Sequence, residues 1–464
     1  MSVWMKVPAS LVRLPAICFL LVLKPAQADA MTLAEAVQKA LNEHPQVAAS
    51  IERQIASEYR LDQTKAALLP TVDLDADVGK QWVERPESLE PENDSRWWLR
   101  RQATVNMRMI LFDGFQRANA IYRDSSKIDA ASLQVLENAE AVALQVVESY
   151  IDHRRHRFLL NIADENIANH QRILELTRVR LEGGKGTQSA VDQVEERLYA
   201  AKAIRAEVLQ ATYEADAKFK AAVGVEPTDT QRVGYPPDMP RTLADTVELA
   251  VANNTAISTR QAEAEAFSFE LERTKSEIMP TLSFEGSAQA GYNLNAVPGH
   301  NNDVQLKLRL NWQIYDGGLR KARIGEASAL AAEAELKRDL EVRNIRKAAE
   351  TVFGKILASG LRRQAVEKQL SAARKVSSSY LSEYEASKRS LLDLLDAESA
   401  VFNSRFEQAS IDGVRLFSAY YLKAITGTLL SSLGATPPSA GVPQFRYQDT
   451  SGRGGVMPKI ESLR

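Results

Sequence analysis

The chain has 464 residues, of which 45% are hydrophobic and 25% are charged, and its formal net charge is -2. These values are ordinary for a folded protein, and the length allows two to four domains. The small net charge and the lack of any basic block of five or more residues exclude a strong general attraction to nucleic acid. We therefore expect no nucleic-acid partner.

The N-terminus has the pattern of a secretory signal. Lys6 and Arg13 precede an apolar run at 14–23, which is about half the length of a membrane-spanning helix. Small residues then mark a cleavage site after Ala28 or Ala30, so residues 1–28 are expected to be a signal peptide. An uncleaved N-terminal anchor is the alternative. The single cysteine lies within the apolar run, so the exported chain would have no disulfide.

The rest of the chain contains one plan twice. Three pairs of landmarks are in register: Leu33 with Leu243, Pro70 with Pro280, and Asp113 with Asp316. The first two pairs are 210 residues apart and the third is 203 apart, so the first copy is seven residues longer in a polar, Pro-rich loop at 83–98. We assign the two repeats to residues 29–240 and 241–433.

Each repeat is expected to begin with a helical stretch, at 32–68 in the first copy, where Thr32 and Glu35 fit a capping box. Two strands follow, and then two long helices at 116–182 and 187–222, matched in the second copy by 319–386 and 390–431. About 67 residues of helix extend roughly 100 Å, a length typical of coiled-coil packing rather than a compact core.

Four segments alternate apolar and polar residues with a period of two, at about 71–83, 98–112, 281–293 and 303–315. Such strands have one apolar and one polar face, and about ten residues also suit a tilted strand that crosses a bilayer. Aromatic residues gather near the strand ends, as in an interfacial girdle: Trp82, Trp97, Trp98, Phe112, Tyr292, Trp312 and Tyr315. A soluble sandwich gives the same alternation and remains the alternative.

Four strands do not close a transmembrane barrel, because the smallest common barrels have about eight. An open sheet edge in lipid is not tolerated. If the strands span a membrane, several chains must share one barrel, and three copies supply twelve strands. Charged residues on the polar faces would then line the lumen: Asp73, Asp75, Asp77, Arg108, Lys307 and Arg309.

Catalytic patterns are weak in this sequence. His153 and His156 lie one turn apart in "HRRH" and form the only pair that suggests a metal site, but a solvated helix face beside two arginines is the favoured interpretation. We find no zinc-protease pattern, nucleophile elbow or dinucleotide fingerprint. We therefore expect no enzyme activity, cofactor or metal.

The segment "LLDLLDAES" at 391–399 contains two carboxylates, Asp393 and Asp396, among leucines. A spacing of three residues puts both acids on one face of a helix. One reading is that both simply favour a helix N-terminus, where the dipole stabilises negative charge. A threefold axis, by contrast, would turn each position into a ring of three carboxylates that attracts cations.

The duplicated plan, "LFDGF" and "IYDGG" after the paired strands, and "LLDLLDAES" resemble the TolC-type outer-membrane efflux and secretion family over residues 30–433. The resemblance implies a mainly α fold with membrane β, in which a homotrimer forms a twelve-stranded barrel in outer-membrane lipid and an α-helical periplasmic tunnel. It also implies passive conduction, with a periplasmic adaptor and an inner-membrane ABC or proton-driven transporter as partners.

The resemblance assigns roles to particular residues. It places Asp393 and Asp396 at the pore constriction, and Tyr384 and Arg389 in a latch that holds the closed state. Ala190 stands where the family has the partner aspartate of the latch, so either the latch is altered or Asp192 is the substitute. The helix tips would dock the adaptor: Gly183, Gly184, Gly186, Thr187 and Ser390.

The C-terminal segment 434–464 is rich in Pro, Gly and Ser and is expected to be disordered. The resemblance favours a type I secreted protein as cargo, with small-molecule efflux as the alternative. Two readings of another class remain: a soluble periplasmic coiled-coil scaffold, and an enzyme with a metal at His153 and His156.

Overall fold

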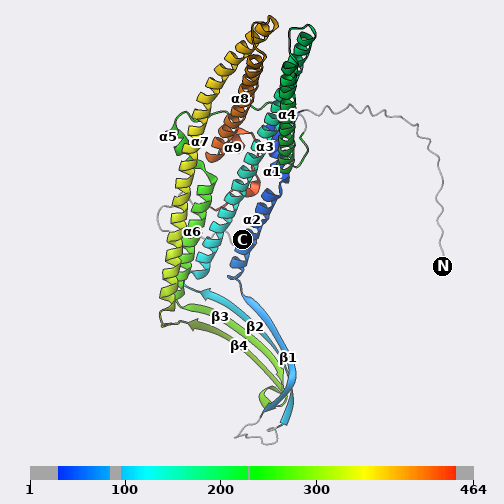
Figure 1. Ribbon diagram of the computed structural model, residues 1–464. Helices are drawn as coiled ribbons and strands as arrows, with labels where there is room; N and C mark the ends of the chain where they lie inside the picture. The colour runs from blue at the N-terminus through cyan, green and yellow to red at the C-terminus, as the bar shows by residue number, and fades with distance from the viewer. Residues whose placement is uncertain (1–29, 84–95, 228–229, 446–464) are drawn as a thin grey trace, which may run out of the picture.

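The computed structural model describes residues 30–83, 96–227 and 230–445, so the predicted signal peptide lies outside the described residues. The molecule is elongated, with a sheet at one end and the tips of two long helical hairpins at the other (Figure 1). The first repeat contains α1 (Leu33–Glu43), α2 (Pro45–Ala66), β1 (Thr71–Val83), β2 (Arg96–Phe112), α3 (Gln116–Glu182) and α4 (Gln188–Val223). The second contains α5 (Leu243–Asn253), α6 (Thr255–Lys275), β3 (Thr281–Tyr292), β4 (His300–Asn311), α7 (Leu319–Glu385), α8 (Leu391–Ile425) and α9 (Leu429–Ser432). The predicted class, mainly helical with four strands, is confirmed.

The first helical stretch is two helices rather than one. The predicted capping box is present, because Thr32 Oγ1 accepts a hydrogen bond from the Glu35 amide and the Glu35 carboxylate accepts one from the Thr32 amide. The helical stretch expected at 32–68 is interrupted, however, since His44 has extended backbone geometry and Pro45 opens α2. A proline lacks the amide that a continuing helix requires, but it fits the first turn of a new one.

The four strands form one antiparallel sheet in the order β1-β2-β3-β4. The prediction for the last strand, 303–315, is wrong at both ends, because β4 covers His300–Asn311. Asn311 pairs with Thr281, the first residue of β3 after Pro280, so the ladder has no further partner for the residues that follow. Trp312 instead donates from its indole to the carbonyl of Ile278 at 3.1 Å.

A tight turn connects each strand pair to a long helix. In the first repeat, Asp113 Oδ2 accepts bonds from the backbone amide and the Nε of Arg117, at 3.2 and 2.7 Å. In the second, Asp316 Oδ2 accepts the same two bonds from Arg320, at 3.0 and 2.7 Å. Gly114, with φ +67°, has no room for a side chain, since a Cβ there would lie 2.5 Å from that of Met279. The paired "DG" landmarks of the sequence are therefore the N-terminal turns of α3 and α7.

The helix α8 ends at Ile425, so the predicted helix at 390–431 is too long. Gly427 has φ +62°, and a Cβ at this position would lie 2.3 Å from the carbonyl oxygen of Asn253. Only glycine fits this close approach, and it breaks the helix before the short α9. The helix α3 has the predicted bounds of 116–182.

The main hydrophobic core lies beside the middle of α3, where α1, α4, α9 and the end of α8 meet it. Tyr150 of α3 and Phe219 of α4 are fully buried there, with ring centroids 6.1 Å apart. The Tyr150 hydroxyl lies within hydrogen-bond distance of two backbone carbonyls, those of Met31 at 2.6 Å and Gln231 at 3.0 Å. Buried polar groups of this kind fix the connecting segments to the helices.

The expected disorder from residue 434 onward is wrong for residues 434–445. Ala435 belongs to the main core, and the amide of Thr436 donates to Gln38 of α1 at 2.8 Å. Further along, the amides of Gln444 and Phe445 both donate to Asp129, at 2.9 and 3.0 Å. A composition rich in Pro and Gly gives no sign of these anchors. Residues 446–464 lie outside the described residues.

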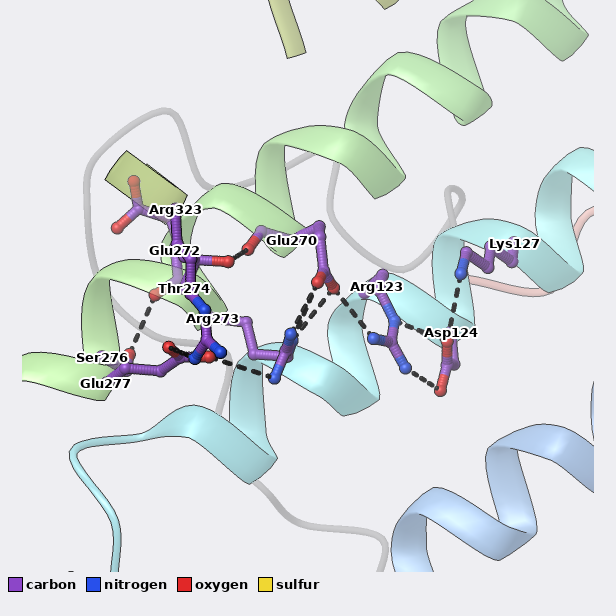
Figure 2. A network of polar contacts seen from close by, with 10 residues as sticks. All are labelled: Arg123, Asp124, Lys127, Glu270, Glu272, Arg273, Thr274, Ser276, Glu277 and Arg323. Carbon is purple, nitrogen blue, oxygen red and sulfur yellow. Dashed lines mark hydrogen bonds and ion pairs between the residues drawn. The ribbon is translucent and has the colours of Figure 1, made fainter. Parts of the chain in front are cut away.

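An ionic network joins the helices near the sheet (Figure 2). Asp124 of α3 is 1% exposed, receives both arms of Arg123 at 2.7 and 2.8 Å, and accepts from Thr64 of α2 at 2.6 Å. Arg123 also donates to Glu270 of α6 at 2.8 Å. Burial acts to raise the pKa of Asp124, but these hydrogen bonds outweigh it and lower the pKa. Further members extend the network to α7: Lys127, Arg273, Glu277 and Arg323.

Candidate functional site

The second hairpin tip contains the residues of the predicted gate. The helix α7 ends at Glu385, and Ser387 follows with a left-handed φ of +62°. The amide of Lys388 donates back to the carbonyl of Glu383 at 2.8 Å. The helix α8 then begins at Leu391, with Ser390 as its N-cap, because Ser390 Oγ accepts from the Asp393 amide at 3.2 Å. The tip is therefore built to start α8 directly before the two acids.

The leucines and the acids of "LLDLLDAES" separate by face. Leu394 and Leu395 are fully buried, in a cluster formed with α3 and α4. Asp393 is half-buried and Asp396 is exposed. The buried cluster comprises Ile173, Leu174, Val191, Val194, Leu198, Tyr384, Leu391, Leu394 and Leu395. The leucines thus hold α8 against its own chain and leave the carboxylates outside.

The two acids differ in their surroundings. Arg389 lies 3.7 Å from Asp393, donates to Glu383 at 2.8 Å, and stacks over the ring of Tyr380 at 4.2 Å. Among the described residues, Asp396 has no hydrogen bond or ion pair. Asp393 is in the first turn of α8, where the helix dipole favours it, but Asp396 is the sixth residue and lies beyond that turn. The dipole therefore explains only one of the two acids.

The structure places Tyr384 and Arg389 at one tip but does not bring Asp192 to them. Asp192 is exposed on α4 and accepts from Gln188 of its own helix at 2.8 Å. Tyr384 is buried instead against α3, where its hydroxyl lies 3.4 Å from Thr177 Oγ1. Within the chain, the predicted latch therefore lacks its aspartate.

Arg180, which sequence reasoning missed, occupies the position beside Tyr384. It stacks over the Tyr384 ring at 4.5 Å and donates to the Tyr384 carbonyl. It also donates to Ser387 Oγ at 3.1 Å. Its position in the last turn of α3 gives no sign of these partners, because they lie more than 200 residues away in the sequence. Arg180 ties the first hairpin to the tip of the second.

The first hairpin tip has the same backbone and less charge. Gly183 caps α3, and Gly184 has φ +68°. A Cβ on Gly186 would lie 3.0 Å from the backbone nitrogen of Leu181, so this position also favours glycine. Thr187 then caps α4 by accepting from the Ala190 amide at 3.3 Å. Both tips are exposed ends of paired helices (Figure 1).

The charged residues predicted for the lumen do share one face of the sheet. In the strand register, Arg108 lies opposite Glu285, and Glu285 lies opposite Lys307. Glu285, which was absent from the predicted set, pairs with Arg309 at 3.1 Å, Lys307 at 3.5 Å and Arg108 at 4.0 Å. On β1, Asp77 pairs with Arg100 at 3.3 Å. The face carries both signs of charge.

The two histidines of "HRRH" point to different partners. His153 is buried and lies 2.6 Å from Asp216, while His156 contacts the carbonyl of Asp152 on its own helix at 2.9 Å. In the part of the chain that the structure describes, no group of three or more His, Cys, Asp or Glu side chains is arranged to hold a metal ion. The same part contains no helix that is long and apolar enough to cross a membrane.

Comparison with known proteins gives a consistent picture. The chain is similar to the outer membrane efflux protein BepC of Brucella suis, with 22% identity over 78% of each chain. It is also similar to the alkaline protease secretion protein AprF of Pseudomonas aeruginosa, with 20% identity over 84% of this chain and 82% of AprF. Its fold matches the outer membrane protein VceC of Vibrio cholerae with a TM-score of 0.73, at 16% identity, over 88% of this chain and 97% of VceC.

The family model for outer membrane efflux proteins matches residues 36–225 and 246–428. These two segments follow the two repeats and cover most of the chain. The four-stranded sheet, the long helical hairpins and the tips described above all lie within or directly between them. The chain belongs to the outer membrane efflux protein family, the outer-membrane channels of efflux and secretion systems.

Proposed function

We propose that three copies of the chain close one twelve-stranded barrel and continue it as a helical tunnel that passively conducts an exported substrate. The observation that carries this proposal is the sheet itself. Its apolar face is uncovered, with Val72, Leu74, Val304 and Leu306 between 64% and 73% exposed. Its outer strands, β1 and β4, have no further strand partner among the described residues. Such a sheet is stable in lipid only when other copies pair its edges.

The long helices support the same assembly. The helices α3 and α7 both have 67 residues, but α3 buries 26 of them and α7 buries only eight. Large apolar side chains along α7 stay exposed within the chain, including Leu336, Leu357 and Leu361 at 61% to 67%. Repeated exposed leucines on a long helix are typical of a surface that packs against another helix. In the trimer, a neighbouring copy covers α7.

At the tips, Asp393 and Asp396 of three copies form two carboxylate rings that constrict the pore and attract cations. The position of both acids outside the leucine cluster and the exposure of Asp396 support this role. Tyr384 and Arg389 belong to the latch that keeps the tips together. Asp192 contacts neither Tyr384 nor Arg389 within the chain, so it belongs to the latch only by reaching these residues in a neighbouring copy.

The tips also dock the rest of the machine. The periplasmic adaptor binds the ends of the hairpins, at Gly183, Gly184, Gly186, Thr187 and Ser390. An inner-membrane ABC or proton-driven transporter supplies the energy. The polar sheet face, with Asp73, Asp75, Asp77, Arg108, Lys307 and Arg309, lines the lumen, and its mixed charge suits a wide water-filled path rather than a selective filter.

The proposed cargo is a type I secreted protein, and the similarity to AprF, an alkaline protease secretion protein, supports it. Small-molecule efflux is the second candidate, since BepC is an outer membrane efflux protein. A strain that lacks this chain separates the two. Loss of a secreted protein from the medium, with unchanged drug sensitivity, supports secretion, and raised drug sensitivity with normal secretion supports efflux.

The assembly is tested with detergent-purified protein. Its mass should be that of a trimer, and in planar bilayers it should give single-channel conductance. A monomer that does not insert would contradict the channel and favour a soluble periplasmic scaffold. A metal-dependent enzyme would instead be purified with stoichiometric zinc at His153 and His156.

A further inference from the structure

The two outer strands of the sheet carry opposite charge on the same face. On β1, the polar face has Asp73, Asp75 and Asp77, all exposed. On β4, the same face has Lys307 and Arg309 toward the C-terminal end of the strand, and both are exposed. The register places these residues on one side of the sheet, since successive opposite pairs link β1 to β4 through β2 and β3.

Neither charged edge is neutralised within the chain. Lys307 and Arg309 share a single carboxylate, that of Glu285, and Arg108 competes for it at 4.0 Å. On the other edge, Asp77 has Arg100 at 3.3 Å. Asp75 accepts only a neutral amide, that of Asn106, at 3.1 Å. Among the described residues, Asp73 has no ion pair. An excess of positive charge on β4 therefore matches an excess of negative charge on β1.

The second strand pair, β3 and β4, is shifted along the strand direction relative to the first pair, β1 and β2. Thr71, at the start of β1, pairs with Arg108, four residues before the end of β2. At the opposite rim, Tyr292 of β3 pairs with Arg101, five residues after the start of β2 at Arg96. Both rims thus shift in the same direction by four to five residues. A closed barrel requires such a stagger between its strands.

Within one chain, Thr71 and Lys307 lie in the same row of the ladder. If a neighbouring copy continues the stagger, its β1 is displaced from this row by four or six residues along β4. An even displacement is required, because an odd one would turn the apolar residues into the lumen. With four residues, Lys307 lies opposite Asp75 and Arg309 opposite Asp73. With six residues, they lie opposite Asp77 and Asp75. With none, Lys307 would lie opposite Thr71.

We propose that the acidic edge of β1 pairs with the basic edge of β4 from a second copy of this chain, and that this charge match selects head-to-tail closure at the staggered register. The pairing rests on the proposed trimer. Opposite charges that face each other across two strands stabilise the pair, and like charges destabilise it. Two copies that met β1 to β1 would oppose aspartates with aspartates, so this device disfavours two-fold dimers and leads to a ring.

Disulfide trapping tests the register. The full-length chain carries Lys307→Cys together with Asp75→Cys or Asp77→Cys, and the matched control carries Lys307→Cys with Thr71→Cys. Directly opposite residues have Cβ atoms about 4.5–5.5 Å apart, close enough for a disulfide after small shifts. Non-reducing gels should show covalent dimers and trimers for one of the first two pairs, at more than tenfold the yield of the control.

The outcomes separate this pairing from the trimer itself. Trimers by mass with efficient cross-links only in the Thr71 control, or in none of the three pairs, would overturn the pairing and leave the proposed function standing. Monomers by mass would overturn the proposed trimer and the pairing with it.

The contribution of charge has its own readout. The temperature at which wild-type trimers dissociate should fall at high salt, because salt screens exposed ion pairs. The double variant Asp75→Asn/Asp77→Asn removes one of the two pairs at a displacement of four residues and both at six, so it should dissociate at a lower temperature and lose about half of this salt dependence or more. Asp303→Asn, a control on the same face of β4, should keep it. An unchanged salt dependence in the double variant would contradict the charge match.

Discussion

The two hairpin tips have one backbone and two chemistries. Gly184 and Ser387, 203 residues apart, occupy the same left-handed position, with φ +68° and +62°. Lys185 and Lys388 each donate from their amides to a carbonyl five residues earlier at 2.8 Å. Four equivalent positions, each 203 residues apart, differ however between the tips. The second tip has Tyr384, Arg389, Asp393 and Asp396 where the first has Leu181, Gly186, Ala190 and Gln193.

This difference shows that the two repeats kept the same turn geometry but acquired different side chains at their tips. Turn geometry and helix caps are retained in both tips, because either hairpin needs them to form. At these four positions the aromatic ring and the charged side chains appear in the second tip only. The second tip therefore contains the residues of the proposed gate, and Arg180 of the first hairpin contacts them.

The largest expected effect on local stability at the tips comes from removing Arg180, which connects the two hairpins. Arg180→Ala removes hydrogen bonds to the second tip and the contact with the Tyr384 ring. Bonds of a charged donor to the half-buried Tyr384 carbonyl and the exposed Ser387 hydroxyl, with the ring contact, are together worth about 2 kcal/mol here. Amide exchange at residues 384–390 should become about 30-fold faster. Arg178→Ala, which removes only an exposed pair with Glu195, is the control, and equal acceleration in both variants would contradict the tie.

A second difference between the repeats lies in the helices. Glu140 of α3 is largely buried against Thr255 of α6, while Arg343 of α7, 203 residues later, is exposed. Burial raises the pKa of Glu140 to about 7. Below pH 4.5 its carboxyl is neutral in both the folded and the unfolded state. As the pH rises through 7, the folded state must accept a charge that it disfavours, and stability is lost.

Glu140→Gln should therefore raise the thermal midpoint at pH 8 and leave it nearly unchanged at pH 4.5. The expected gain is about 3 kcal/mol, from a pKa shift of this size. Glu148→Gln, at an exposed position of the same helix, serves as the control. A gain that is the same at both pH values would show that burial of Glu140 is not the cause.

The smallest effect concerns the turn that both tips share. Gly184→Ala places a side chain in open space, so its cost is that of the left-handed backbone alone, about 1 kcal/mol. Local amide exchange at the first tip should rise about fivefold. Ser387→Gly relieves the same strain but loses the contact with Arg180, so it should be close to neutral. A large loss from Ser387→Gly would mean that the hydroxyl contact dominates the second tip.

Much of the fold was predictable because its signals are local. Period-two alternation located all four strands, and the "DG" landmarks marked the turns before α3 and α7. Apart from the helix break at Pro45, which is a local signal, the errors arose where a distant partner decides the structure. Alternation continues to Trp312 and Ile314, but the ladder stops at Asn311 because β3 begins at Thr281. Gly427 ends α8 because it lies against Asn253.

The site was predictable only in part for the same reason. The helix period alone puts Asp393 and Asp396 on one face, and the structure leaves both outside the leucine cluster. The partner of Tyr384 was not predictable, since Arg180 is in the other repeat. The role of Asp192 depends on a neighbouring copy and stays a prediction.

The central claim is that Asp393 and Asp396 form the cation-binding constriction of a trimeric channel. Its most direct test is the conductance of purified protein in a planar bilayer, titrated with a trivalent cation from the periplasmic side. We expect block of the wild-type channel, and at least tenfold weaker block with higher conductance in Asp393→Ala/Asp396→Ala. Glu182→Gln, at an exposed acid of the first tip, should be blocked like the wild type. Equal block of the wild type and the double variant would contradict the claim.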